Sequence, residues 1–126
     1  MYKLSQRSLK RLKGVDKRLV SIVKEAIHNS PYDFGIAWMG GYRTAEMQND
    51  LYSAQKSKCD GYKKKSKHQT GLAFDIVVYK DGVITWDSNT FSDVADHIMY
   101  IATTKGVTLT WGGNWRNFRD LPHFEI

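Results

Sequence analysis

The sequence predicts an α+β fold, in which a small antiparallel sheet packs against N-terminal helices and one later helix. Three observations favour it: a helical period fills the first 30 residues, strand and hairpin patterns dominate the second half, and one further helical pattern separates the strands. A chain of 126 residues has the usual length of one domain, so we expect residues 1–126 to form a single domain with one core.

Two helices are expected within residues 5–30. Apolar residues recur with the 3.6-residue period on both sides of Gly14, which should separate the two helices. Asp16 is a suitable cap for the second helix, and Pro31 ends it. A third helix is expected to begin near Thr44, which can also cap.

The strands are expected at residues 34–39, 72–79, 107–111 and 123–126. Asp81-Gly82 predicts a tight turn after which residues 83–86 return antiparallel. The later helix should span the apolar pattern from Phe91 to Ala102, with Thr90 as its cap and Gly106 at its end. The segment 53–67 is polar and rich in lysine, so we expect an exposed loop.

The net charge of the chain indicates the class of partner but does not identify a single partner. A net charge of +6 favours polyanions, and nucleic acid, anionic lipid and cell-wall polymers all qualify. No run of about 18 apolar residues exists, so we expect no stable membrane insertion. The basic N-terminus lacks the apolar segment of a secretory signal, which predicts synthesis in the cytoplasm. The single cysteine, Cys59, excludes an internal disulfide.

An aspartate interrupts the most apolar strand of the sequence. Asp75 follows Leu72-Ala73-Phe74 and precedes Ile76-Val77-Val78, where burial of an unpaired carboxylate would be unfavourable. A cation is the simplest partner that would keep it ionised. His68 lies just before this strand, and Gly71 allows the left-handed backbone that a turn from His68 into the strand would need.

A second polar cluster occurs at the C-terminal end. His123 and Glu125 should share one face of the last strand, because side chains alternate along a strand. Asp120 lies three residues before His123 and would reach the same side only through a bend, which Pro122 favours. Two histidines and one aspartate leave a fourth position for water, which is typical of a catalytic rather than a structural zinc site. A nearby carboxylate should then move the proton.

Three motifs in this order resemble a known family. Ser66-x-His68-x-x-Gly71-x-Ala73-x-Asp75, Asp120-x-x-His123 and Gly41-Tyr42-Arg43-Thr44 are similar to the motifs of the zinc D-alanyl-D-alanine carboxypeptidase and L-alanyl-D-glutamate peptidase family. The whole chain looks like the short phage endolysins that are L-alanyl-D-glutamate peptidases.

The resemblance implies the residue roles. His68, Asp75 and His123 would hold one Zn²⁺ on the small sheet, Asp120 would act as the catalytic acid and base, and Arg43 would assist the substrate carbonyl or carboxylate. Two further residues are weaker candidates for substrate contact, Ser66 and Trp115. The implied activity is hydrolysis of the L-alanyl-D-glutamate bond in the peptidoglycan stem peptide during host lysis, by a monomer that a phage pore releases to the cell wall.

Several alternatives stay open at this point. Glu125 could replace Asp120 as the base or support His123, and Ser66 could serve only as a cap. A Cys59–His68 nucleophile pair is a further, weaker reading. The chain could also be a D-alanyl-D-alanine dipeptidase or carboxypeptidase, or a non-enzymatic module that binds nucleic acid or the cell wall. Nucleic acid is the less favoured partner, because no motif of that class is present and binding needs no aspartate inside a strand.

Overall fold

A computed structural model describes all 126 residues and has the expected α+β architecture. The α-helices are α1 (Gln6–Arg11), α2 (Lys17–Ala26), α3 (Ala45–Ser53) and α4 (Ser88–Thr104). The strands are β1 (Asp33–Ile36), β2 (Ala73–Lys80), β3 (Val83–Thr85), β4 (Thr110–Trp111) and β5 (His123–Glu125). Three short 3-10 helices complete the chain: η1 (Ile27–Asn29), η2 (Lys67–Thr70) and η3 (Gly112–Asn114).

All strand pairs are antiparallel, and β2 is the centre of the sheet. The order is β1-β2-β5-β4, and β3 also pairs with β2. The first three residues of β2 pair with β5, whereas its later residues pair with β1 and β3. The first half of β2 therefore positions β5, and the second half forms the hairpin with β3.

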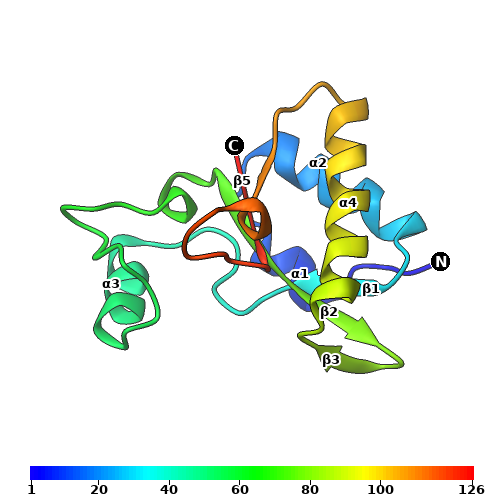
Figure 1. Cartoon of the computed structure of the whole chain (residues 1–126). Helices are drawn as coiled ribbons and strands as arrows, with labels where there is room; N and C mark the ends of the chain where they lie inside the picture. The colour runs from blue at the N-terminus through cyan, green and yellow to red at the C-terminus, as the bar shows by residue number, and fades with distance from the viewer.

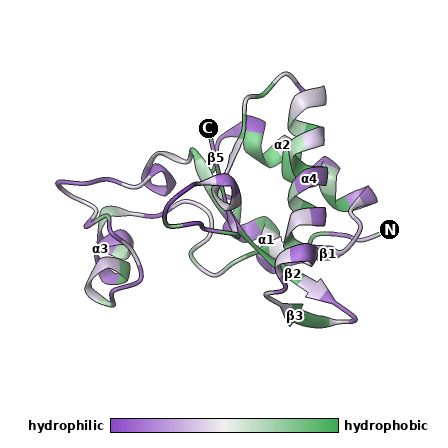
Figure 2. Ribbon diagram, viewed as in Figure 1, coloured by the Kyte–Doolittle hydropathy of each residue, from purple (hydrophilic) through white to green (hydrophobic).

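The core lies where α2 and α4 pack on each other and α4 packs on β2. Figure 1 shows these two helices together on one side of the molecule, with α3 and the green loop after it on the opposite side. Hydrophobic colour concentrates on the helix pair and the strands, whereas the loop after α3 is largely hydrophilic (Figure 2). Each large apolar side chain that is fully buried in such a core contributes about 1.5 to 3 kcal/mol.

Local sequence signals explain the ends of most helices. Asp16 caps α2 by accepting a hydrogen bond from the Arg18 amide, and Thr44 caps α3 through the Met47 amide, as the sequence predicted. The predicted cap of α4 was wrong. Asp87 caps this helix, because its carboxylate accepts hydrogen bonds from both the amide and the hydroxyl of Thr90.

Two strands are shorter than predicted by two residues or more. β1 stops at Ile36, because the chain turns where the Gly40 amide donates to the Ala37 carbonyl. The strand expected at 107–111 is reduced to Thr110–Trp111, since the Val107 amide instead donates to the Ala102 carbonyl at the end of α4. The tight turn at Asp81-Gly82 is confirmed, with positive φ at both residues.

Candidate metal centre

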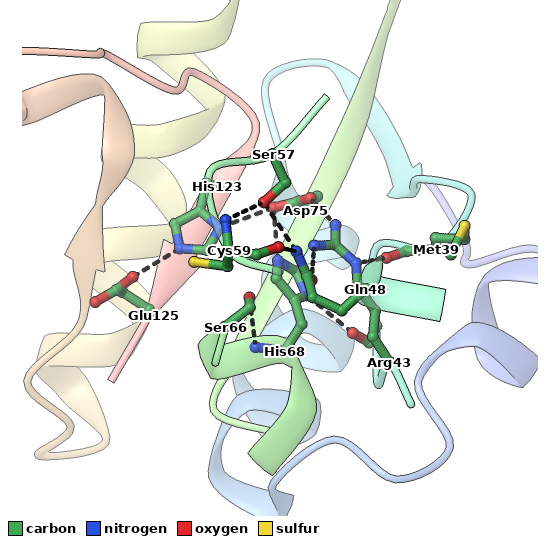
Figure 3. A network of polar contacts seen from close by, with 11 residues as sticks. Met39, Arg43, Gln48, Ser57, Cys59, Ser66, His68, Asp75, His123 and Glu125 are labelled. Carbon is green, nitrogen blue, oxygen red and sulfur yellow. Dashed lines mark hydrogen bonds and ion pairs between the residues drawn. The ribbon is translucent and has the colours of Figure 1, made fainter. Parts of the chain in front are cut away.

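Two histidine rings and one carboxylate converge where β2 pairs with β5. One side-chain atom from each of His68, Asp75 and His123 lies within 4.8 Å of the other two. His68 Nε2 and His123 Nδ1 lie 3.3 and 2.9 Å from Asp75 Oδ1 (Figure 3). Ligand atoms of a tetrahedral zinc site with bonds of 2.0–2.1 Å lie about 3.4 Å apart, so the spacing fits such an ion. The structure therefore brings the three predicted ligands together.

The sheet register places two of these ligands side by side. Asp75 and His123 are direct cross-strand partners, so their side chains lie on the same face of the sheet. Phe74 precedes Asp75, and Phe124 follows His123. Both phenylalanines point to the other face of the sheet, where their rings stack in the core with centroids 5.0 Å apart. The alternation along β2 and β5 thus separates an apolar core face from a polar site face.

His68 reaches the site from η2, just before β2. Its backbone amide donates to the Ser66 hydroxyl, which caps η2, and Gly71 ends this turn with φ of 74°. The His68 Nδ1 atom lies 2.9 Å from the Gly41 carbonyl oxygen, which can only accept a hydrogen bond. Nδ1 therefore carries the proton, and the lone pair of Nε2 is free to bind a metal ion.

His123 is oriented from its other side. Its Nε2 atom lies 2.8 Å from Glu125 Oε1, and Lys67 Nζ lies 3.2 Å from Glu125 Oε2. With Nε2 donating to this carboxylate, Nδ1 is the nitrogen that faces Asp75. A carboxylate on the outer nitrogen is the usual arrangement around metal-binding histidines, because it fixes the ring and raises its basicity. Glu125 is thus a partner of His123, one of the two roles that the sequence left open.

The electrostatics of the cluster suit a bound cation. Burial would raise the pKa of Asp75, but the contacts of its carboxylate with His123 and His68 hold that pKa far below its usual range. Burial opposes a charge on His123, yet its contacts with Asp75 and Glu125 leave its pKa raised. The neighbouring carboxylates therefore favour a proton on His123, and a bound metal ion can replace that proton.

Arg43 contacts the Asp75 oxygen that faces away from the two histidines. Its Nη2 donates to Asp75 Oδ2 at 3.1 Å, its Nε to the Met39 carbonyl at 2.7 Å, and its Nη1 to Gln48 Oε1 at 3.1 Å. These three bonds fix the guanidinium plane and turn Asp75 Oδ1 toward the histidines (Figure 3).

Gln48 is a residue that the sequence interpretation missed. Its side chain is fully buried, and its amide also donates to the Ser57 hydroxyl and the Cys59 carbonyl, both in the loop after α3. The signal was present, because a glutamine lies next to Leu51 on the inward face of a predicted helix, where a polar side chain needs partners.

A cavity of about 410 Å³ opens over the cluster, and Asp120, Trp115 and Ser66 help to line it. The His123 amide donates to the Asp120 carbonyl, so the bend expected at Pro122 exists and carries Asp120 to the site. The Asp120 carboxylate makes no hydrogen bond or ion pair, and burial together with the negative Asp75 raises its pKa. The Trp115 and His123 rings lie 5.3 Å apart.

Other parts of the molecule offer no comparable chemistry. Two larger hollows, of about 610 and 690 Å³, contain no group of three side chains that could hold a metal ion. Cys59 lines the site cavity, but both ring nitrogens of His68 have other partners, so the Cys59–His68 pair is not formed. None of the helices combines the length and the hydrophobicity that spanning a bilayer requires.

Comparisons with known proteins give a consistent result. Residues 1–125 match the family described as phage L-alanyl-D-glutamate peptidase. The L-alanyl-D-glutamate peptidase of Escherichia phage T5 is 32% identical over 127 residues, covering 99% of this chain and 89% of the phage protein. The peptidoglycan L-alanyl-D-glutamate endopeptidase CwlK of Bacillus subtilis is 30% identical over 124 residues, covering 91% and 73%. The crystal structure of the Serratia marcescens L-Ala D-Glu endopeptidase ChiX superposes with a TM-score of 0.83 at 30% identity, covering 96% and 86%.

Proposed function

The chain belongs to the phage L-alanyl-D-glutamate peptidase family, and from this premise we propose that His68, Asp75 and His123 hold one zinc ion for its reaction. The protein is a peptidoglycan endopeptidase that cleaves the L-alanyl-D-glutamate bond of the stem peptide. The main support for the zinc proposal is the orientation of the His68 and His123 rings, which sets the nitrogen of each ring that is protonated. Each outer nitrogen faces an acceptor, and each inner nitrogen faces Asp75 Oδ1.

The ion, when bound, supplies Lewis-acid chemistry: it polarises the scissile carbonyl and acidifies a water molecule. Everything else comes from side chains of this chain. Asp120 lines the cavity with a free carboxylate, so it can take a proton from the attacking water and return it to the leaving amine. Its raised pKa suits both halves of this transfer, because the acid form is easier to regenerate near neutral pH.

We favour Asp120 over Glu125 as this acid and base. Glu125 already binds His123 Nε2 and Lys67 Nζ, which lowers its pKa and makes it a poor proton acceptor. Asp120 has no such partners. A group that exchanges protons with water and substrate has to be free to form hydrogen bonds to both.

Arg43, Trp115 and Ser66 complete the proposed site. A guanidinium has five N–H groups, and three of those in Arg43 are used, which leaves two to stabilise the oxyanion that develops on the substrate carbonyl. Trp115 offers an aromatic wall to the peptide. Ser66 lines the cavity as well, although its hydroxyl is already used as the cap of η2.

The remaining expectations follow from the same premise. The protein acts on the cell wall, and we propose that a phage pore releases it there. We also propose that residues 1–126 form one catalytic domain, which is a monomer and has no affinity for nucleic acid. A single hydrophobic cluster that joins the helices to the sheet supports the one-domain proposal.

Mass spectrometry of digested peptidoglycan tests the reaction. New amino termini at D-glutamate are expected, and release of D-alanine with intact L-alanyl-D-glutamate bonds would instead indicate a carboxypeptidase. A chelator should abolish the digestion and added zinc should restore it. Replacement of His68, Asp75 or His123 by alanine should reduce the zinc content measured by elemental analysis, and unchanged zinc content in all three variants would refute the ligand set.

A further inference from the structure

The substrate carries a negative charge next to the bond that is cut. Glutamate has two carboxyl groups besides its amine. When its amine is joined to L-alanine and one carboxyl carries the peptide onward, the other carboxyl remains free. A carboxylate therefore lies within a few bonds of the scissile nitrogen, and a site specific for this bond gains from a cation at that position.

Four cationic side chains line the cavity, and two of them already have partners. Arg43 is bound to Met39, Gln48 and Asp75. Lys67 binds the Glu125 carboxylate and the Ile126 carbonyl oxygen.

The other two cations of the cavity are Lys56 and Lys65. Neither side chain forms an ion pair or a hydrogen bond within the protein, and both are exposed to solvent. The cavity thus has two lysines whose charges no group of the protein neutralises.

The backbone that carries these lysines is held in place although the loop is at the surface. The Lys56 amide donates to the Leu51 carbonyl at 2.9 Å, and the next residue, Ser57, accepts a hydrogen bond of 2.8 Å from the buried Gln48 amide. Figure 3 shows Ser57 and Cys59 of this loop directly beside Gln48 and Arg43.

Lys65 is fixed from the other end of the loop. It directly precedes Ser66, whose amide donates to the Gln69 side chain at 2.9 Å. The same Gln69 side chain donates to the Gly61 carbonyl at 2.9 Å and so ties the middle of the loop to η2. Both lysines therefore start from ordered backbone at the cavity, which limits the entropy that is lost when they bind a ligand.

We propose that Lys56 and Lys65 form a carboxylate-binding subsite that receives the free carboxylate of the D-glutamate residue on the leaving side of the scissile bond. This inference rests on the proposed peptidase function and adds a determinant of its specificity. Because both side chains stay partly hydrated, each should contribute about fivefold to kcat/KM, at the upper end of what exposed charge pairs provide.

The test uses two synthetic peptides that contain the L-alanyl-D-glutamate bond. One keeps the free carboxylate of D-glutamate, and the other has a carboxamide at that position. The variants are Lys56→Gln, Lys65→Gln and the double variant. Lys63→Gln is the matched control, because Lys63 belongs to the same loop and carries the same charge but does not line the cavity.

For the carboxylate peptide, we expect KM to rise about fivefold in each single variant and more than tenfold in the double variant, with kcat nearly unchanged. For the carboxamide peptide, the wild-type protein should already show the higher KM, and the variants should add little. Lys63→Gln should match the wild type on both peptides.

Three outcomes would overturn the subsite, and a fourth would refute the peptidase function on which it rests. Equal losses on both peptides would mean that the lysines support the loop rather than the carboxylate, and an equal loss in Lys63→Gln would mean general attraction by positive charge. If the wild type cleaved neither peptide at the alanyl-glutamate bond, as seen by mass spectrometry, the peptidase proposal itself would fail. If it cleaved both with the same KM, only the subsite would be refuted.

Discussion

Replacing Asp120 by asparagine keeps the shape of the side chain and removes its charge and its proton affinity. The Asp120 carboxylate has no hydrogen bond or ion pair in the protein, so the substitution should leave folding and the three proposed zinc ligands intact. A general acid and base contributes about 10²- to 10⁴-fold, which corresponds to about 3 to 5 kcal/mol of barrier at 1.36 kcal/mol per tenfold. We therefore expect kcat to fall by that factor while the zinc content stays the same.

The matched comparison is Glu125→Gln, which keeps an oxygen that can accept the hydrogen bond from His123 Nε2 but loses the charge. Loss of an outer partner of a metal-binding histidine weakens metal affinity by about 10- to 100-fold. With saturating zinc, this variant should recover most of its kcat, whereas Asp120→Asn should not. Rates come from peptide cleavage followed by chromatography, and zinc content from elemental analysis. Full activity in Asp120→Asn, together with an inactive but zinc-loaded Glu125→Gln, would show that the two roles were assigned the wrong way round.

Four further predictions concern stability, pH and zinc affinity. Gln48→Leu removes three hydrogen bonds of a buried amide and leaves Arg43 short of a partner, so urea unfolding should show a loss of about 1 to 3 kcal/mol, and an unchanged midpoint would contradict the network. Gly71→Ala forces a side chain into a backbone with φ of 74°, where its Cβ would lie 2.5 Å from the Gly14 carbonyl, and should destabilise by at least about 1 kcal/mol in the same assay. In zinc-free protein, the raised pKa of His123 stabilises the fold fully below about pH 6.5, and this stabilisation is lost as the pH rises through the pKa of the folded protein. The lowered pKa of Asp75 also stabilises the fold, and that contribution is lost only in strong acid. Zinc affinity should change in the opposite sense and rise with pH as the zinc displaces the proton of His123; calorimetric titration that showed tighter binding at lower pH would refute this.

The sequence alone determined the fold class, because it depends on local rules, and the resemblance of its motifs to a known family implied the candidate ligands. Period, caps and turn residues are properties of neighbouring positions, so the helices, the hairpin at Asp81-Gly82 and the polar interruption of a strand by Asp75 could be predicted. Errors arose where two local signals competed. Asp87 and Thr90 are both capping types, and only the structure shows that the carboxylate of Asp87 binds the amide and hydroxyl of Thr90.

Only the tertiary structure decided how the ligands are held. The proton positions on His68 and His123 depend on the Gly41 carbonyl, which is 27 residues away from His68, and on the spacing of Glu125 along β5. The hydrogen bonds by which Gln48 joins Arg43 to Ser57 and Cys59 form only because the loop after α3 folds back over that helix. Such contacts join parts of the chain that no period or motif relates, because hydrogen bonds between distant segments depend on the packing of the whole domain.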